Sequence, residues 1–383
     1  MFDFSLTEDQ RSAVETVRRF AEQHLAPVVE ECEEAERFPM DVFGKFGRAG
    51  YLATRVPEKY GGADIDKVTE CLVREELSRV SQGFESSWSV HNMVTRVLAD
   101  FGSVEQQEAY LPAAVAGEII TSLGVTEPES GSDVKGIRTR ARRDGGDWVI
   151  NGSKMFITNG TLCEFVLVLC WTNDTKDYRN GMSLLLVPRE SPGFVVSQKL
   201  RKEGIRMSET AELAFQDCRV PLGNVVGEEG KGFYHVMEFL SENRIAVAAG
   251  CVGIARAAVE ASTEYASRRE AFGRPIGSFQ AIQHKIADMA TELDAARLIT
   301  LRAGWMLDQG MPSAREASMA KLFASEVAVR AASEAMQIHG GYGIMREFPV
   351  GRLLRDARVY TVGEGTSEIQ RNIIGESVLG MRG

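Results

Sequence analysis

The sequence predicts an α+β protein in which one block of strands separates two blocks of helices. Apolar residues recur at three-to-four spacing from Ser5 to about residue 118, which is typical of amphipathic helices. From about Ile119 to Gly230 short β-like runs alternate with turns. After Gly232 long Ala-rich helical stretches return. Strands confined to one segment do not fit an alternating βαβ sheet.

The first block should begin with a capped helix. Thr7 and Gln10 have the spacing of a capping box, in which each side chain bonds the other residue's backbone N–H. The apolar face behind it consists of Val14, Val17, Phe20, Ala21 and Leu25. Further helices are expected at 66–80, 88–101 and 104–116.

The middle block carries hairpin chemistry. Asp144 to Asp147 and Asn151-Gly152 contain the Asp, Asn and Gly residues that tight hairpin turns need. Strands are expected at 165–169, 183–187 and 212–215, where β-branched, aromatic and other apolar residues gather.

The last block should be a set of long helices broken at Gly-rich junctions. Their expected ranges are 233–268, 277–309, 314–338 and 366–379. We therefore expect three domains, with bounds 1–120, 121–230 and 231–383.

Composition excludes several classes of function. The chain has 383 residues, 44% of them apolar, and a net charge of −10, without a block of five basic residues, so nucleic-acid binding is not expected. Apolar runs such as Phe165–Trp171 are shorter than the roughly 18 to 20 residues that span a bilayer. The acidic N-terminus lacks a signal-peptide pattern, and we expect no membrane association and a cytoplasmic location.

The cysteines and histidines indicate neither a disulfide framework nor a metal site. Six cysteines are scattered without a CxxC pair, as expected for buried thiols in a reducing compartment. Five histidines show no ligand spacing, and the sequence has neither a Walker loop nor a GxGxxG motif after a strand.

Three polar, Gly-rich segments are the candidate ligand loops: 121–136, 336–357 and 363–371. Glycines there permit close approach of backbone to a ligand. In the third, Glu364 lies between two glycines and just before a helix that Thr366 could cap, a way to present a base into a cleft.

Five ordered motifs resemble those of the acyl-CoA dehydrogenase family, and the resemblance covers essentially the whole chain. They are VTEPESGSDV (125–134), NGSKMFITNG (151–160), RREAFGRPIGSFQAIQ (268–283), QIHGGYG (337–343) and EGTSEIQR (364–371). The resemblance implies an N-terminal α-helical domain, a central β-barrel or sandwich domain and a C-terminal four-helix bundle. It also implies one FAD per subunit and a homotetramer.

The resemblance also implies which residues hold FAD. The flavin ring would be lined by Leu123, Val125, Thr126, Ser132, Phe156, Ile157 and Thr158. The FAD of a neighbouring subunit would be reached by Arg269, Phe272, Gln280, Gln337, Gly340 and Gly341. Contacts to the subunit's own FAD would come from Thr366 and Glu368.

The implied reaction converts an acyl-CoA thioester to its trans-2-enoyl or cyclic enoyl product. Glu364 matches the base that removes the α-proton, while flavin N5 takes the β-hydrogen as hydride and passes the electrons to electron-transferring flavoprotein. Further substrate contacts would come from Ser132, Asn243, Arg244 and Gly365. Relatives of isovaleryl-CoA dehydrogenase place the base where this chain has Asn243, so Glu364 is the better candidate and Glu242 is its control.

Two alternative classes share this fold. One comprises oxidases and monooxygenases, and the other is a non-metabolic DNA-binding flavoprotein, which the net charge of −10 disfavours. The acyl group stays open among short, branched, cyclic and medium chains. In the stretch FESSWSVHN, Glu85 occupies the place of an Arg that binds the distal carboxylate in glutaryl-CoA dehydrogenases, and Trp88 could shape the acyl cavity.

Overall fold

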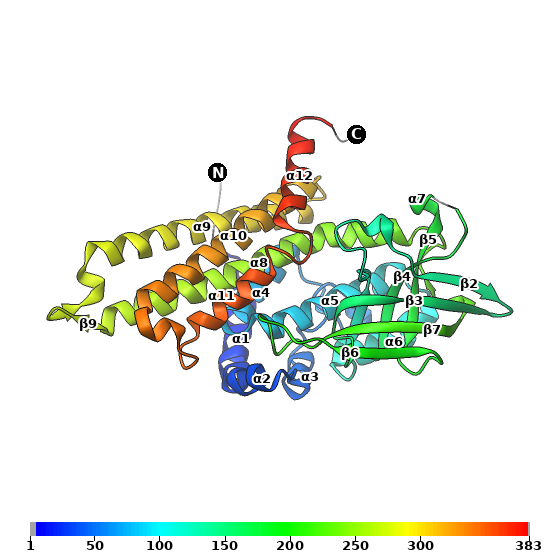
Figure 1. Cartoon of the computed structure of the whole chain (residues 1–383), viewed down its shortest axis with the longest axis horizontal. Helices are drawn as coiled ribbons and strands as arrows, with labels where there is room; N and C mark the ends of the chain where they lie inside the picture. Colours follow the sequence, from blue (N-terminus) through cyan, green and yellow to red (C-terminus); the bar gives the residue numbers. More distant parts are fainter. Residues whose placement is uncertain (1–4, 176, 382–383) are drawn as a thin grey trace.

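The computed structural model describes residues 5–175 and 177–381, and it confirms the α+β class with its order of helices, strands and helices. In Figure 1 the strands gather at one end of the molecule and the long C-terminal helices extend to the other. The N-terminal helices are α1 (Glu8–Phe20), α2 (Val29–Ala35), α3 (Met40–Arg48), α4 (Lys67–Val80), α5 (Gln82–Phe101) and α6 (Val104–Ala116).

Local signals account for the helix starts. The capping box of Thr7 and Gln10 is present at α1. Helix α5 begins at Gln82, six residues before the expected start, because the Ser81 hydroxyl accepts a hydrogen bond from the Phe84 N–H. Its first turn is polar in sequence but buried, so hydrophobic periodicity does not reveal it.

The middle block is one eight-stranded sheet of order β6-β7-β3-β2-β4-β5-β8, with β1 beside β4. Its elements are β1 (Thr121–Gly124), β2 (Arg140–Asp144), β3 (Asp147–Thr158), β4 (Phe165–Trp171), α7 (Tyr178–Gly181), β5 (Met182–Pro188), β6 (Phe194–Lys199), β7 (Thr210–Pro221) and β8 (Val225–Val226). Alternate residues of β4 face two cores. Phe165, Leu167 and Leu169 pack with helix residues, while Val166 and Val168 pack with the other strands.

One expected hairpin is confirmed and the other is wrong. Asp144 and Asp147 pair across the β2–β3 turn. Asn151-Gly152 instead lies inside β3, where the register with β7 shifts and Gly152 has φ of 148°. The Asn151 amide exchanges two hydrogen bonds with Asp217, so its polar side chain stabilises a bulge rather than a turn.

The last block contains α8 (Gly232–Arg268), α9 (Gln280–Asp308), α10 (Ala314–His339), α11 (Val350–Val359) and α12 (Ser367–Val378), with the short pair β9 (Glu270–Ala271) and β10 (Arg274–Pro275) between α8 and α9. Helix α11 lies in a segment that the sequence analysis treated as a ligand loop. Alanines from α8 and α10 dominate the core between these helices, which lets their backbones approach closely.

Helix α8 is long and apolar enough to cross a membrane, so the expectation that no segment reaches that length is wrong. However, 72% of its most apolar window is buried inside the protein. Packing against other helices therefore explains its composition. All six cysteines are buried and free, as expected.

Two buried carboxylates join the β block to helices. The segment between β6 and β7 donates the Ile205 N–H to Asp356 on α11 at 2.6 Å and the Met207 N–H to Glu33 on α2 at 3.0 Å. Burial raises the pKa of Asp356 to about 7, against the opposing charge of Arg352.

A buried ion pair fixes the loop that follows β1. The Lys154 ammonium on β3 lies 2.8 Å from the Glu127 carboxylate and donates to the Val125 carbonyl at 2.9 Å. The same carboxylate accepts the N–H groups of Arg138 and Thr139. The Lys154 bonds hold the loop against β3, and the two N–H bonds join the start of the loop to its end.

Asp356→Asn should alter how stability depends on pH. A raised folded-state pKa means that the contribution of Asp356 is complete below about pH 4, the unfolded pKa, and is lost as pH rises through 7. Asn stays neutral and its carbonyl can still accept the Ile205 N–H. The wild-type melting temperature, followed by circular dichroism, should therefore fall by a few degrees more than that of the variant between about pH 5 and 8. Parallel curves would contradict this.

Lys154→Met should destabilise the fold by about 3–5 kcal/mol, because the Glu127 carboxylate would stay buried without its cation. Urea unfolding followed by fluorescence measures this change. Lys45→Met is the matched control, since Lys45 is exposed and lies 3.8 Å from Asp41. Equal urea midpoints for the two variants would show that the buried pair does not hold the loop.

Candidate active site

The glycine-flanked glutamate lies on a strained turn between α11 and α12. Glu364 has φ of 56° and Gly365 has φ of 85°. The left-handed region is uncommon for a residue other than glycine and often marks a functional site. The Thr366 hydroxyl then caps α12 by accepting the Ile369 N–H at 3.3 Å, as the sequence predicted.

Several buried polar atoms at this turn lack a hydrogen-bond partner among the described residues. Glu364 Oε2, Ser367 Oγ and Gln370 Oε1 are buried and have no hydrogen-bond partner among the described residues. An unsatisfied buried acceptor destabilises a fold by about 1–3 kcal/mol. Their concentration on one turn indicates a place where a ligand completes the hydrogen bonding.

Two side chains bond the carbonyl groups of this turn. Lys321 on α10 donates from Nζ to the Gly365 carbonyl at 2.5 Å. Gln370 on α12 donates to the same carbonyl at 3.0 Å and to the Glu364 carbonyl at 3.4 Å. The sequence analysis missed both residues. The signal available for Lys321 was a charged residue on the Ala-rich face of a helix.

Charges from α8 and α12 also act at this place. Burial lowers the pKa of Lys321 to about 8, the charges of Glu364 and Glu368 oppose that shift, and the charge of Arg244 adds to it. Arg244 and Glu364, both predicted site residues, are therefore brought to one cluster. Asn243, the neighbour of Arg244 on α8, is buried.

The β block brings together most of the residues expected at the flavin ring. The Met155 N–H donates to the Thr126 carbonyl at 2.9 Å, and the Ser122 hydroxyl donates to the Thr158 carbonyl at 2.6 Å. These bonds place Leu123, Val125 and Thr126 beside the segment 156–158. Lys154 and Glu127, which the sequence analysis did not single out, hold this arrangement.

Phe156 is the most exposed of these residues. Its backbone has φ of 61° at a bulge in β3, and 68% of the residue is exposed, while Ile157 beside it is 3% exposed. A large aromatic side chain held in solvent by a strained backbone fits a surface that a planar ligand covers. Ser132 is exposed in the adjoining loop and Thr158 is half-buried.

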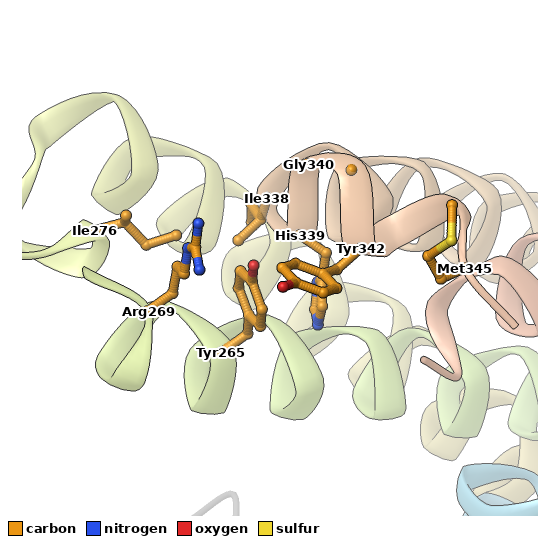
Figure 2. Close-up of a pocket in the computed structure, with 9 residues that line it drawn as sticks. Tyr265, Arg269, Ile276, Ile338, His339, Gly340, Tyr342 and Met345 are labelled. Atoms are coloured by element: carbon orange, nitrogen blue, oxygen red, sulfur yellow. The ribbon is translucent and has the colours of Figure 1, made fainter. Parts of the chain in front are cut away.

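A separate cavity of about 540 Å³ lies where α8 ends beside the end of α10 (Figure 2). Arg269, Gly340 and Gly341 line it, as do aromatic side chains, and the Arg269 guanidinium lies 5.7 Å from the Tyr342 ring centroid. No atom would obstruct a Cβ at either glycine, so the backbone there is open to a ligand. Among the other predicted residues, Phe272, Gln280 and Gln337 are exposed and do not line the cavity.

The cavity and the Glu364 turn are far apart in one chain. Arg244 and Arg269 are separated by 25 residues along α8 and its C-cap, which at about 1.5 Å per residue is roughly 37 Å. In Figure 1, β9 lies at the opposite end of the molecule from the sheet. One phosphate or ring cannot touch both places within a single chain.

Glu85 and Trp88, expected in the acyl pocket, are packed inside the N-terminal block. Glu85 is 2% exposed and accepts hydrogen bonds from Arg74 at 2.5 Å and Gln82 at 2.6 Å, rather than from the neighbouring serines. Trp88 is fully buried, with its indole N–H bonded to the Tyr51 and Leu52 carbonyls. Their contact with an acyl group stays a prediction.

Comparisons with known proteins agree with the predicted family. Family models described as the N-terminal, middle and C-terminal domains of acyl-CoA dehydrogenase match residues 7–118, 122–218 and 230–379. The probable acyl-CoA dehydrogenase YngJ of Bacillus subtilis is 43% identical over 379 residues, covering 98% of this chain and 100% of that protein.

Two solved structures extend the likeness to three dimensions. The chain superposes with a TM-score of 0.96 and 38% identity on one described with the electron transferring flavoprotein of Acidaminococcus fermentans, covering 99% of this chain and 100% of that one. It superposes with a TM-score of 0.93 and 34% identity on glutaryl-CoA dehydrogenase of Mycobacterium smegmatis in complex with FADH2, covering 98% and 95%. The chain therefore belongs to the acyl-CoA dehydrogenase family and is an FAD-dependent oxidoreductase that acts on a CH–CH group.

Proposed function

We propose that this chain dehydrogenates an acyl-CoA thioester to the trans-2-enoyl-CoA, with Glu364 as the base that removes the α-proton. The observation that carries the proposal is the buried, unpartnered Oε2 atom of Glu364 on its strained turn. A carboxylate with a free acceptor position beside Arg244 and Lys321 can receive a proton from a substrate carbon placed against it.

The chain's own groups supply positioning and proton transfer. The Glu364 carboxylate would take the α-proton, and the main-chain N–H of Glu364 would bond the thioester oxygen as negative charge develops there. Ser132, Asn243, Arg244 and Gly365 would contact the substrate around this point. FAD supplies the acceptor for the hydride that leaves the β-carbon.

The residues present fit FAD in two separate places. The first is the surface formed by Leu123 to Thr126 and the exposed Phe156 ring, to which we assign Thr366 and Glu368 at the start of α12. The second is the cavity beside Arg269 and the open glycines of the α10 end. Because the part of α8 near Arg244, beside the Glu364 turn, and the cavity beside Arg269 are roughly 37 Å apart along the helix, we infer that the second place serves the FAD of a neighbouring subunit.

Association into a homotetramer would supply that neighbour. Large apolar side chains are exposed on the last helices, and covering them with a second copy would remove apolar surface from water. They are Leu298, Trp305, Met319, Val378 and Leu379. We further propose electron-transferring flavoprotein as the electron acceptor and the cytoplasm as the location, where the free cysteines fit a reducing compartment.

For the acyl group we propose a monocarboxylic chain. Glu85 is already paired with Arg74, so this buried site has no spare cation for a second substrate carboxylate. A screen with a dye acceptor should therefore find turnover with one or more of butyryl-, isobutyryl-, octanoyl- and cyclohexanecarbonyl-CoA. Glutaryl-CoA as the preferred substrate would contradict this assignment.

Glu364→Gln should keep FAD and bind acyl-CoA but reduce the flavin at least about 10²-fold more slowly, because the amide cannot accept the α-proton. Anaerobic stopped-flow absorbance measures the rate. Glu242→Gln is the control and should stay close to wild type. A mild effect at Glu364 with a crippling one at Glu242 would move the base to α8. Rapid peroxide production at each wild-type turnover would assign the chain to the oxidases.

Arg269→Ala should lower the FAD content of the purified protein, because its guanidinium lines the cavity that we assign to a neighbouring subunit's cofactor. Arg268→Ala is a matched control, since Arg268 is adjacent in sequence, exposed and paired with Glu264. Flavin absorbance and size-exclusion chromatography measure cofactor content and assembly. If both variants retain FAD equally, Arg269 is a surface residue.

A further inference from the structure

We propose that Lys321 is a positioning residue for the base: its buried ammonium fixes the Glu364 turn through a hydrogen bond to the Gly365 carbonyl. This inference rests on the proposed function of Glu364 as the base. It assigns a part in the reaction to Lys321, which lies outside the five motifs and the predicted site residues.

The geometry joins Lys321 directly to the turn. The residue is fully buried in α10, and its Nζ lies 2.5 Å from the Gly365 carbonyl oxygen. The Gln370 amide bonds the same oxygen from α12 at 3.0 Å. A Cβ at Gly365 would lie 2.7 Å from that amide nitrogen, so the turn fits tightly between the two donors.

An ordinary ion pair with a neighbouring carboxylate does not account for the charged side chain of Lys321. Small side chains surround it on its own helix, among them the buried Ala317, Ala320 and Ala324. A buried ammonium without compensating bonds destabilises a fold, so an apolar residue would be the usual occupant of such a position. The hydrogen bond that the structure gives this ammonium goes to the turn that carries Glu364.

The titratable groups around Lys321 come from three further elements: Arg244 and the Cys251 thiol from α8, Glu364 from the turn and Glu368 from α12. Burial raises the pKa of the Cys251 thiol to about 12, so this thiol is neutral. Burial lowers the pKa of Lys321 to about 8, so most of the ammonium is retained at neutral pH. The retained ammonium donates to the Gly365 carbonyl and so holds the backbone of the Glu364 turn.

Two substitutions separate the hydrogen bond from the charge. Lys321→Gln keeps a donor of similar length but removes the charge, whereas Lys321→Met removes both. Arg330→Gln is the control on the same helix, because Arg330 is exposed and paired with Glu292. Flavin content, acyl-CoA affinity and the rate of anaerobic flavin reduction should be measured for each from about pH 6 to 9.

Lys321→Met should reduce the flavin about 10- to 100-fold more slowly at its best pH, with acyl-CoA affinity within about threefold of wild type, since a misplaced base affects the reacting state most. Lys321→Gln should retain more of the rate.

A wild-type rate of flavin reduction in Lys321→Met would overturn the inference. Gln370→Leu tests the turn from α12 without changing a charge, in case the Lys321 variants do not fold. It should slow flavin reduction, and a wild-type rate would overturn the role of the two donors. If Glu364→Gln is crippled while the Lys321 and Gln370 variants are normal, only this inference fails. A normal Glu364→Gln overturns the base assignment as well.

Discussion

The direction of the Glu364 side chain depends on how two main-chain carbonyl groups of its turn are bonded. A non-glycine residue in the left-handed region is strained by about 1–3 kcal/mol and persists only where its surroundings determine it. Here Lys321 and Gln370 bond the carbonyls from two helices. The packing of α10 against α8 and α12 therefore holds the backbone of this turn, and under the proposed function the core alanines of α8 and α10 contribute through that packing to the position of the base.

Buried carboxylates that accept main-chain N–H groups join the β block to the helices and also fix a loop within it. Asp356 and Glu33 bond the segment between β6 and β7, and Glu127 bonds the backbone before β2. Each carboxylate bonds main-chain N–H groups and not only a partner side chain. It therefore fixes the position of the loop backbone as well as stabilising it. Lys154 then neutralises Glu127 and fixes the surface beside Phe156.

Features encoded by neighbouring residues could be predicted from the sequence, and features that depend on distant residues could not. The Thr7 cap and the turn of Glu364 each have their signal within a few positions. By contrast, Asn151-Gly152 has turn chemistry that the pairing of β3 with β7 overrides. Lys154 and Lys321 are charges in apolar surroundings, and their meaning appears only when their partners, 27 and 44 residues away, are in place.

The length of α8 ties cofactor binding to assembly. This helix is continuous from Gly232 to Arg268. The Glu364 turn near Arg244 and the cavity near Arg269 therefore lie far apart in one chain. Under the proposed function, an FAD that contacts both kinds of surface must lie between subunits. Flavin binding and subunit association would then stabilise each other by mass action, because each favours the same assembled state. The exposed apolar side chains of α9 and α12 would be covered in that state, and the residues that complete one subunit's flavin site would belong to its neighbour.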